Sequence, residues 1–354
     1  MSIQQRIPVA VLGATGMVGQ RFIELLQGHP WFELVGLAAS EQHRKQPYGQ
    51  VARWRLAGEM PSAVAALPVV ACHPAELPDV KIVFSALPAE VANEVEAEFA
   101  QAGVAVFSNT KNYRMAPDVP LVVPEVNPEH LAAIPQQRQA RHWPGFIVTN
   151  PNCSATPLVM ALKPLQEAFG LRKVLITTMQ AISGAGYPGL PSYDILDNVI
   201  PFISGEEEKL ESETQKMLGS WQTSTGFTNA PVIVSAHCNR VSTREGHLEC
   251  ASIEFARTAD LAEILAVWER FVGEPQHLGL PSAPRQALLY RHEADRPQTL
   301  LDRDAGQGMT VTLGRLRPCP ILHYKFVMLG HNTIRGAAGG SLLNAELCVS
   351  KGYL

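Results

Sequence analysis

One cysteine lies where nucleophilic chemistry is expected. Residues 149–157 read TNPNCSATP, in which Asn-Pro-Asn predicts a turn and the residues after Cys153 predict a helix. The dipole and free N–H groups of a helix N-terminus stabilise a thiolate. Together with the Asn152 amide, these groups would also stabilise an oxyanion on a carbonyl that the sulfur attacks. The motif predicts a thioester-forming nucleophile, and a buried structural cysteine is the alternative.

An arginine and a histidine flank one loop of the predicted second half. Arg240 and His247 enclose the loop of RVSTREGHLE, which we interpret as a β-hairpin that points both side chains into one pocket. Histidine suits general acid–base work beside a thiolate, and an arginine fork suits a carboxylate. A histidine taken alone is more often a packed or solvated residue, so the assignment depends on the cysteine.

Three further segments carry polar groups. Glu206 and Lys209 share a helix face in GEEEK, where a solvated helix start is the alternative. Arg114 and Asn112 follow a predicted strand in SNTKNYR, and open parallel sheets bind ligands at such strand ends. We therefore expect Arg114 to bind an anion. Gln180 ends a strand before a glycine-rich loop and could orient a substrate.

The glycines near the N-terminus predict a dinucleotide site. Gly13, Gly16 and Gly19 in GATGMVG lie between a strand and a helix, where helix N–H groups bind phosphates. The second strand ends at Ser40 rather than at the acid typical of NAD enzymes, and Arg44 follows. A hydroxyl with a nearby cation favours the 2′-phosphate of NADP, with a solvated loop as the alternative for Arg44.

The predicted elements fall into two groups that indicate two domains. Strands are expected at 7–13, 33–39, 80–86 and 104–108, alternating with helices at 17–27 and 89–102. This alternation predicts an α/β domain with a Rossmann-like doubly wound parallel sheet. Further strands are expected at 173–182, 231–238, 248–256, 310–316 and 321–329, with helices at 155–169 and 260–272. We expect an NADP-binding domain over 1–152 with a C-terminal helix in 335–354, and an α+β catalytic and dimerisation domain with a mixed, largely antiparallel sheet over 153–334.

Composition excludes several classes of protein. The net charge is −4 and no basic tract stands out, which argues against binding to nucleic acid or a membrane surface. No run approaches the roughly 18–20 apolar residues that span a bilayer, and no secretory leader precedes the first strand. The six cysteines are scattered without a Cys-x-x-Cys pair, so neither a zinc site nor a disulfide framework is expected. We expect a cytoplasmic protein without a metal.

The motifs together resemble the aspartate-semialdehyde dehydrogenase family, in particular its archaeal and fungal-like branch. They are, in order, GATGMVG, SNTKNYRM, VPEVNPEH, TNPNCS, QAISGAGYPG, DNVIPFISGEEEK, CNRVSTREGH and NTIRGAAGG. The resemblance implies that L-aspartyl 4-phosphate and NADPH give L-aspartate 4-semialdehyde, phosphate and NADP. It also implies a homodimer or homotetramer and a role in making lysine (through diaminopimelate), threonine and methionine.

The resemblance also implies a role for each matched residue. Cys153 matches the nucleophile, His247 the acid–base group and Gln180 the residue that orients the acyl intermediate. The substrate-binding residues implied are Arg240 for the α-carboxylate, Glu206 for the amino group, and Arg114, Asn112 and Lys209 for the phosphate. The cofactor contacts expected are Gly13, Ala14, Thr15, Gly16, Met17, Val18, Gly19, Ser40, Arg44, Ser85, Gly184, Asn332 and Gly336.

Two related activities and one other class of protein compete with this interpretation. Malonyl-CoA reductases resemble the same branch and would use Cys153 and NADPH, but Glu206 would then have no ammonium to bind. N-acetyl-glutamyl-phosphate reductase shares the chemistry, but its nucleophile region is not expected to read NPNC. A non-catalytic NADP-binding scaffold would keep the glycine motif and lose the reactive residues.

Overall fold

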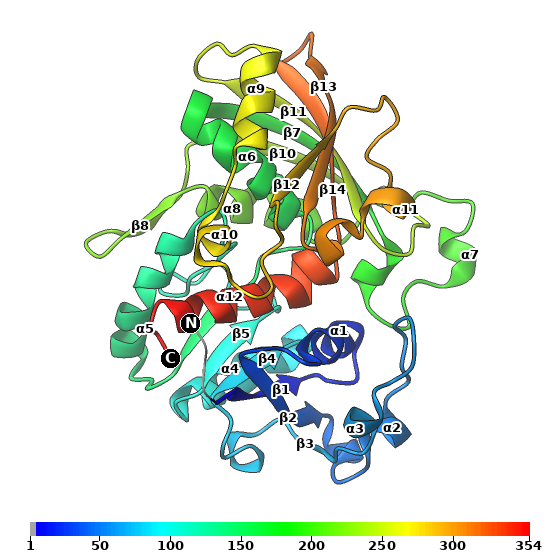
Figure 1. Cartoon of the computed structure of the whole chain (residues 1–354), viewed down its shortest axis with the longest axis vertical. Helices are drawn as coiled ribbons and strands as arrows, with labels where there is room; N and C mark the ends of the chain where they lie inside the picture. The colour runs from blue at the N-terminus through cyan, green and yellow to red at the C-terminus, as the bar shows by residue number, and fades with distance from the viewer. Residues whose placement is uncertain (1–4) are drawn as a thin grey trace.

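The computed structural model describes residues 5–354 and contains two six-stranded sheets (Figure 1). The first sheet is parallel throughout and has the order β3-β2-β1-β4-β5-β6. Its strands are β1 (Ile7–Leu12), β2 (Phe32–Ala39), β3 (Val69–Ala71), β4 (Ile82–Ser85), β5 (Ala105–Ser108) and β6 (Phe146–Thr149). The order reverses between β1 and β4, and this switch point is where such sheets bind ligands.

Helices cover both faces of the first sheet, so its strands are apolar on both sides. The main helices are α1 (Met17–Leu26), α4 (Ala89–Gln101), α5 (Ile134–Arg141) and α12 (Gly339–Ser350). Val9 and Phe84 pack in one core with Phe22 of α1 and Leu342 of α12, whereas Ala10 lies in a second core on the opposite face. The last helix therefore returns to the first domain, and in Figure 1 it lies between the two sheets.

The second sheet is mixed and has the order β10-β7-β11-β14-β13-β12. Its strands are β7 (Leu171–Gln180), β10 (Ile233–Arg240), β11 (His247–Phe255), β12 (Leu288–Arg291), β13 (Val311–Pro318) and β14 (Tyr324–Gly330). Two pairs are parallel, β10 with β7 and β12 with β13, and the other pairs are antiparallel. One face packs against α6 (Ala155–Phe169), α8 (Glu206–Met217) and α9 (Leu261–Glu269).

The expected fold class is confirmed, and two details differ from the expectation. The strands β3, β6 and β12, of three or four residues each, were not predicted; length alone does not explain this, since β4 and β5 are as short and were predicted. The hairpin expected between Arg240 and His247 is wrong, because β7 lies between β10 and β11. Both side chains still reach one place, since β7 brings Gln180 between them.

The remaining elements are short. The helices are α2 (Tyr48–Val51), α3 (Ser62–Ala65), α7 (Ser192–Ile195), α10 (Glu274–Leu278) and α11 (Thr299–Asp302).

A two-stranded ribbon, β8 (Ser220–Gln222) with β9 (Gly226–Thr228), carries Phe227, whose ring lies 5.0 Å from the ring of His130. His130 is fully buried, and its Nδ1 lies 3.0 Å from the Asn127 amide nitrogen. Burial, followed by the charge of Lys216, lowers the pKa of His130 to about 4.

This buried histidine predicts a loss of stability in mild acid. The unfolded chain takes up the proton below about pH 6.5, whereas the folded protein takes it up only near pH 4, so stability falls as the pH drops through this window. We expect the change from pH 7 to pH 5 to cost about 2 kcal/mol at this site. In urea titrations, His130→Gln should lose less stability than the wild type over this range, and exposed His277→Gln should behave as the wild type. An unchanged pH dependence in His130→Gln would contradict the account.

Candidate active site

Cys153 and His247 face each other at the junction of the two domains. Cys153 lies two residues before α6, and its Sγ is 3.1 Å from Nε2 of His247, the first residue of β11. The backbone N–H of Ala181 donates to Nδ1 of the same ring at 3.0 Å. A neutral ring with this bond carries its proton on Nε2, so His247 presents a hydrogen-bond donor to the sulfur.

Burial keeps this pair uncharged in the free protein. It raises the pKa of Cys153 to about 12, and the charge of Glu206 adds to the shift, while Arg114, Arg240 and Lys209 oppose it. Burial, followed by the charge of Arg240, lowers the pKa of His247 to about 3. The expected stabilisation of a thiolate by the helix N-terminus is therefore outweighed by desolvation.

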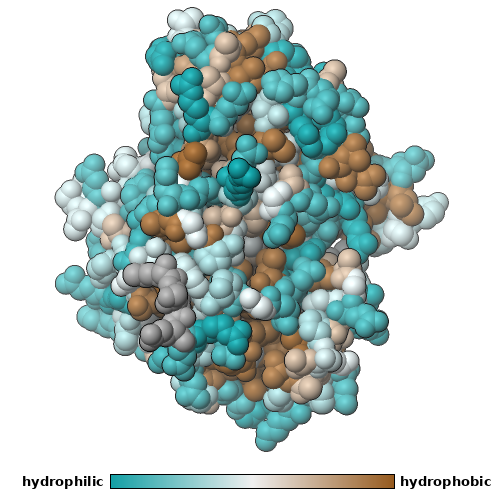
Figure 2. All heavy atoms as spheres, in the orientation of Figure 1, coloured by the Kyte–Doolittle hydropathy of each residue, from teal (hydrophilic) through white to brown (hydrophobic). Residues whose placement is uncertain are grey.

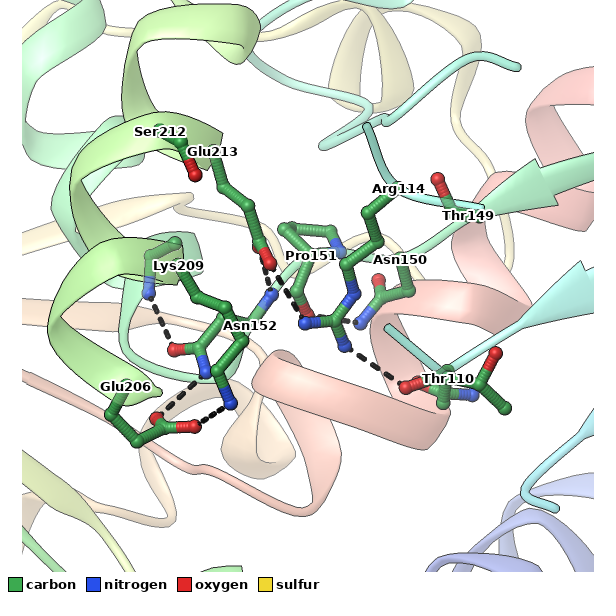
Figure 3. Close-up of polar contacts among 12 residues, drawn as sticks. Thr110, Arg114, Thr149, Asn150, Pro151, Asn152, Glu206, Lys209, Ser212 and Glu213 are labelled. Carbon is green, nitrogen blue, oxygen red and sulfur yellow. Dashed lines mark hydrogen bonds and ion pairs between the residues drawn. The ribbon is translucent and has the colours of Figure 1, made fainter. Parts of the chain in front are cut away.

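Two carboxylates of α8 hold the turn that precedes the cysteine (Figure 3). Glu213 accepts the backbone N–H of Asn152 at 2.6 Å, and Glu206 accepts its side-chain amide at 2.8 Å. The Asn152 side-chain oxygen in turn accepts the N–H of Ser154 at 2.8 Å. Asn152 thus joins α8 to the beginning of α6.

This arrangement changes the interpretation of Asn152. Its amide was expected to stabilise an oxyanion, but the structure ties that amide to Glu206. The backbone N–H of Cys153 is a better candidate, since it makes no hydrogen bond within residues 5–354. The role expected for Asn152 as an oxyanion donor stays a prediction, and the structure adds a role in fixing the turn.

Gln180 and Lys209 converge on the same carboxylate. The Gln180 amide lies 3.3 Å from Glu206, and Lys209 forms an ion pair with it one turn further along α8. Burial alone would raise the pKa of Glu206, but the charge of Lys209 and the hydrogen bonds from Lys209, Asn152 and Gln180 lower it below its ordinary value. Glu206 therefore remains a carboxylate that is available to a cation.

A glycine-rich loop lies over Arg240 and His247. The short helix η4 (Ile182–Ala185) carries Gly184, where an added Cβ would stand 2.8 Å from Arg240 Nη1 and 3.4 Å from the His247 ring. Arg240 also donates to the Ala181 carbonyl at 2.7 Å. The structure places Arg240 behind this loop, and Arg240 does not line the cavity beside Cys153.

A cavity of about 560 Å³ connects the cysteine to the glycine turn. Its wall includes Cys153, Gly184, Asn332 and Gly336 of the expected set, together with Gly16, Met17, Val18, Arg114, Glu206 and Lys209. Gly336 has no alternative there, since an added Cβ would lie 2.7 Å from Cys153 Cβ. The Asn332 side chain accepts the N–H of Gly246 at 2.9 Å and donates to Ser183 at 2.8 Å, which links this wall to the loop over Arg240.

The anion-binding residues differ from expectation in one place. Arg114 reaches the cavity, where it donates to Glu213 and to the Asn109 carbonyl, both at 2.9 Å. The Asn112 amide instead donates to the Ala89 carbonyl at 2.8 Å, and Asn112 does not line the cavity. Its neighbour Lys111 does, although sequence reasoning passed over it. Only the direction of one loop side chain separates the two residues, and the sequence carried no signal for it.

A second cavity of about 600 Å³ continues along the glycine turn and fits the rest of a dinucleotide. Gly13 has φ +75°, and an added Cβ would meet the Ala86 carbonyl oxygen at 2.5 Å, so only glycine suits this cradle. Thr15, Gly16 and Ser40 line this cavity as expected, with Glu41, Cys72 and His73 beside them.

Four expected cofactor residues lie away from either cavity. Arg44 forms an ion pair with Glu76 and does not line the cavity beside Ser40. Ser85 and Ala14 are fully buried, and Gly19 packs against the Gly13 carbonyl, where an added Cβ would stand 2.3 Å away. These four residues shape the turn or its surroundings rather than the surface of the cavity.

Residues 5–354 contain neither a candidate metal site nor a helix that could cross a membrane. No cluster of histidine, cysteine and acidic side chains in this part of the chain could hold a metal ion. None of its helices has the length and apolar character needed to cross a membrane.

The fold and these cavities indicate a dinucleotide-binding enzyme with a reactive cysteine, and comparison with known families indicates the same class of protein. Residues 8–134 match the NAD-binding domain of semialdehyde dehydrogenases, and residues 162–335 match the dimerisation domain of the same enzymes. The chain belongs to the aspartate-semialdehyde dehydrogenase family.

Three relatives place the chain within that family. It is 51% identical to the aspartate-semialdehyde dehydrogenase of Archaeoglobus fulgidus, over 98% of this chain and 99% of the relative. It is 40% identical to the NADP-dependent malonyl-CoA reductase of Metallosphaera sedula, over 99% of both chains. The crystal structure of aspartate-semialdehyde dehydrogenase with NADP from Candida albicans superimposes with a TM-score of 0.91 at 42% identity, over 99% of this chain and 100% of that one.

The uncharged state of the Cys153–His247 pair predicts the pH dependence of thiol alkylation. Because only the thiolate reacts, modification of Cys153 by iodoacetamide should rise about tenfold per pH unit between pH 6 and pH 9. Peptide mass spectrometry follows each cysteine separately. Cys319 is an internal comparison that should react faster, because the N–H of Leu322 lowers its pKa. A plateau for Cys153 below pH 7 would instead indicate a thiolate–imidazolium pair.

Proposed function

We propose that this enzyme reduces L-aspartyl 4-phosphate to L-aspartate 4-semialdehyde with NADPH, through a thioester on Cys153. The observation that carries the proposal is that one cavity is bounded by both the dinucleotide turn and the paired cysteine. Such a cavity brings a bound nicotinamide and a covalently held acyl group together without further domains.

The chemistry divides into acylation and reduction. In acylation, Sγ bonds to the acyl carbon, the bond from carbon to the phosphate oxygen breaks, and the thiol proton leaves with the phosphate. The bound dinucleotide supplies the hydride that reduces the thioester by two electrons, and a proton from solvent completes the aldehyde and thiol when the C–S bond breaks. His247, whose Nε2–H faces the sulfur, passes this proton to the departing thiolate. The Cys153 N–H stabilises the carbonyl oxygen.

The ammonium and the carboxylate of the aspartyl group each have an oppositely charged residue at the site. Glu206 binds the α-ammonium, a role supported by its lowered pKa and its position in the cavity wall. Arg240 binds the α-carboxylate once the loop over it shifts, because a guanidinium fork matches a carboxylate. The ammonium also separates this substrate from malonyl-CoA, which would leave Glu206 without a cationic ligand.

The phosphate is assigned to Lys111 together with Arg114 and Lys209. Arg114 and Lys209 are already paired with Glu213 and Glu206, whereas Lys111 makes no ion pair within residues 5–354. When the substrate ammonium binds Glu206, Lys209 is released toward the phosphate. Lys111 replaces Asn112 in this account because the Asn112 side chain points out of the cavity.

NADP is the cofactor that we favour. Its support is the hydroxyl of Ser40 in the cavity wall and the presence of NADP in the crystal structure of the Candida albicans relative. Arg44 could reach a 2′-phosphate only by exchanging Glu76 for it. The binding domain itself is established by its family match.

A cytoplasmic homodimer or homotetramer is the assembly that we favour. The face of the second sheet opposite α6 and α9 exposes Leu175 of β7 and Ile233 of β10, in a domain whose family model is a dimerisation domain. Figure 2 also shows apolar residues on the side that carries α7 and α11, and Leu196 directly after α7 and Leu300 of α11 are exposed.

The assay that tests the function runs in the oxidative direction. Aspartate semialdehyde is mixed with NADP or NAD, with and without inorganic phosphate, and reduced cofactor is followed by absorbance. We expect phosphate-dependent reduction of NADP that exceeds the reduction of NAD. If neither cofactor is reduced while malonyl-CoA oxidises NADPH, the substrate assignment is wrong and the malonyl-CoA alternative replaces it.

The phosphate assignment predicts different effects for two neighbouring residues. Lys111→Met removes a cation of the cavity that makes no ion pair within residues 5–354, so the KM for phosphate should rise about tenfold or more, whereas the KM for NADP stays constant. Asn112→Ala is the matched control and should change the KM for phosphate by less than about twofold. A larger effect for Asn112→Ala than for Lys111→Met would return the role to Asn112.

A further inference from the structure

A second polar row lies directly behind the catalytic one. Arg240 and Gln180 pair in register at the ends of β10 and β7, and His247 begins β11 beside them. Two residues back, on the same face, Thr178 pairs with both Cys238 of β10 and Glu249 of β11. All three side chains in this second row are buried, and Glu249 has no exposed surface at all.

Glu249 is anomalous because nothing neutralises its charge. No basic side chain in residues 5–354 forms an ion pair with it, and neither carboxyl oxygen has a hydrogen-bond partner there. Burial raises the pKa of Glu249 well above its ordinary value, and only the nearby hydroxyl of Ser154 opposes the shift. Desolvation strongly disfavours an isolated buried carboxylate, so the neutral acid is the stable form.

Ser154, whose hydroxyl lies near Glu249, is also a buried polar residue without a hydrogen-bond partner in the described part of the chain. It follows Cys153 directly, precedes the first residue of α6, and is fully buried. Its hydroxyl also lacks an aligned partner. Two neighbouring buried polar groups without other partners satisfy each other when one of them carries a proton.

We propose that Glu249 is a positioning residue, held as a neutral carboxylic acid, whose O–H donates to Ser154 and so fixes the turn that carries Cys153. The second row, Thr178, Cys238 and Glu249, then positions the nucleophile and does not supply protons. A negative charge at Glu249, beside the residue that follows Cys153 in the chain, would disfavour ionisation of the thiol. The positioning role rests on the proposed function of Cys153, whereas the protonation of Glu249 does not depend on that function.

Replacement of Glu249 separates this role from its alternatives. Glu249→Gln keeps a neutral hydrogen-bond donor of the same shape, so kcat should stay within about threefold and the pH profile of Cys153 alkylation should not move. Glu249→Leu removes the donor, and kcat should fall about tenfold while the KM for NADP is unchanged. Glu254→Gln is the control, because Glu254 lies on the opposite face of the same strand and pairs with Lys173.

Coupling to Ser154 provides a test that a general packing role would not pass. If Glu249 acts through Ser154, Ser154→Ala should lower kcat as Glu249→Leu does, and the double variant should be no worse than either single variant. Additive losses would show that the two residues do not act as a unit and would overturn the proposal.

Infrared spectroscopy tests the protonation without any substrate. The wild type at pH 7 should show the carbonyl stretch of a protonated carboxylic acid, and this band should be absent from Glu249→Gln. Absence of the band in the wild type, or a shift of the alkylation profile in Glu249→Gln, would mean that Glu249 is ionised and would overturn the inference. Failure of the wild type to oxidise aspartate semialdehyde would instead count against the proposed function and leave the infrared result intact.

Discussion

Two carboxylates on one face of α8 hold the turn on which the rest of the site depends. Glu206 and Glu213 are seven residues apart, so they lie two turns apart on the same side of the helix. They bind the side chain and the backbone of Asn152, which in turn binds the first N–H groups of α6. The cysteine is therefore positioned by a helix of its own domain, and the sheet brings His247 to the fixed sulfur.

The same carboxylates also control the charge of the cavity. Arg114 is neutralised by Glu213 and Lys209 by Glu206, whereas Lys111 of the same cavity makes no ion pair within residues 5–354. A substrate that carries an ammonium and a phosphate exchanges partners with these pairs rather than adding charge to the site. Such an exchange favours a ligand that has both groups over one that has anionic groups and no ammonium. It is a physical reason to prefer aspartyl phosphate to malonyl-CoA at this site.

Local sequence signals predicted the parts of the structure that depend on local geometry. The turn at Gly13, the helix after Cys153 and the alternating strands of the first domain follow from residue types at short spacing. The hairpin prediction failed because the insertion of β7 between β10 and β11 is a long-range pairing that no local pattern records.

The side-chain partners were the least predictable part of the site. Lys111 and Asn112 are neighbours, and only the direction of the loop puts the lysine in the cavity. Arg44 is paired with Glu76, more than thirty residues away, which the sequence did not indicate. Glu213 could have been found, because a second acid seven residues after Glu206 lies on the same helix face. Glu249 was not distinguishable, since its meaning depends on burial that only the folded sheet creates.

The central claim is that the turn held by α8 presents Cys153 as the nucleophile. A single-turnover experiment tests it most directly: enzyme is mixed with aspartate semialdehyde and NADP in the absence of phosphate, and the protein is then digested for mass spectrometry. Without phosphate the acyl group cannot leave readily, so the account predicts a burst of about one NADPH per site and an aspartyl adduct on Cys153. An adduct on another residue, or a burst with no adduct at Cys153, would contradict the account.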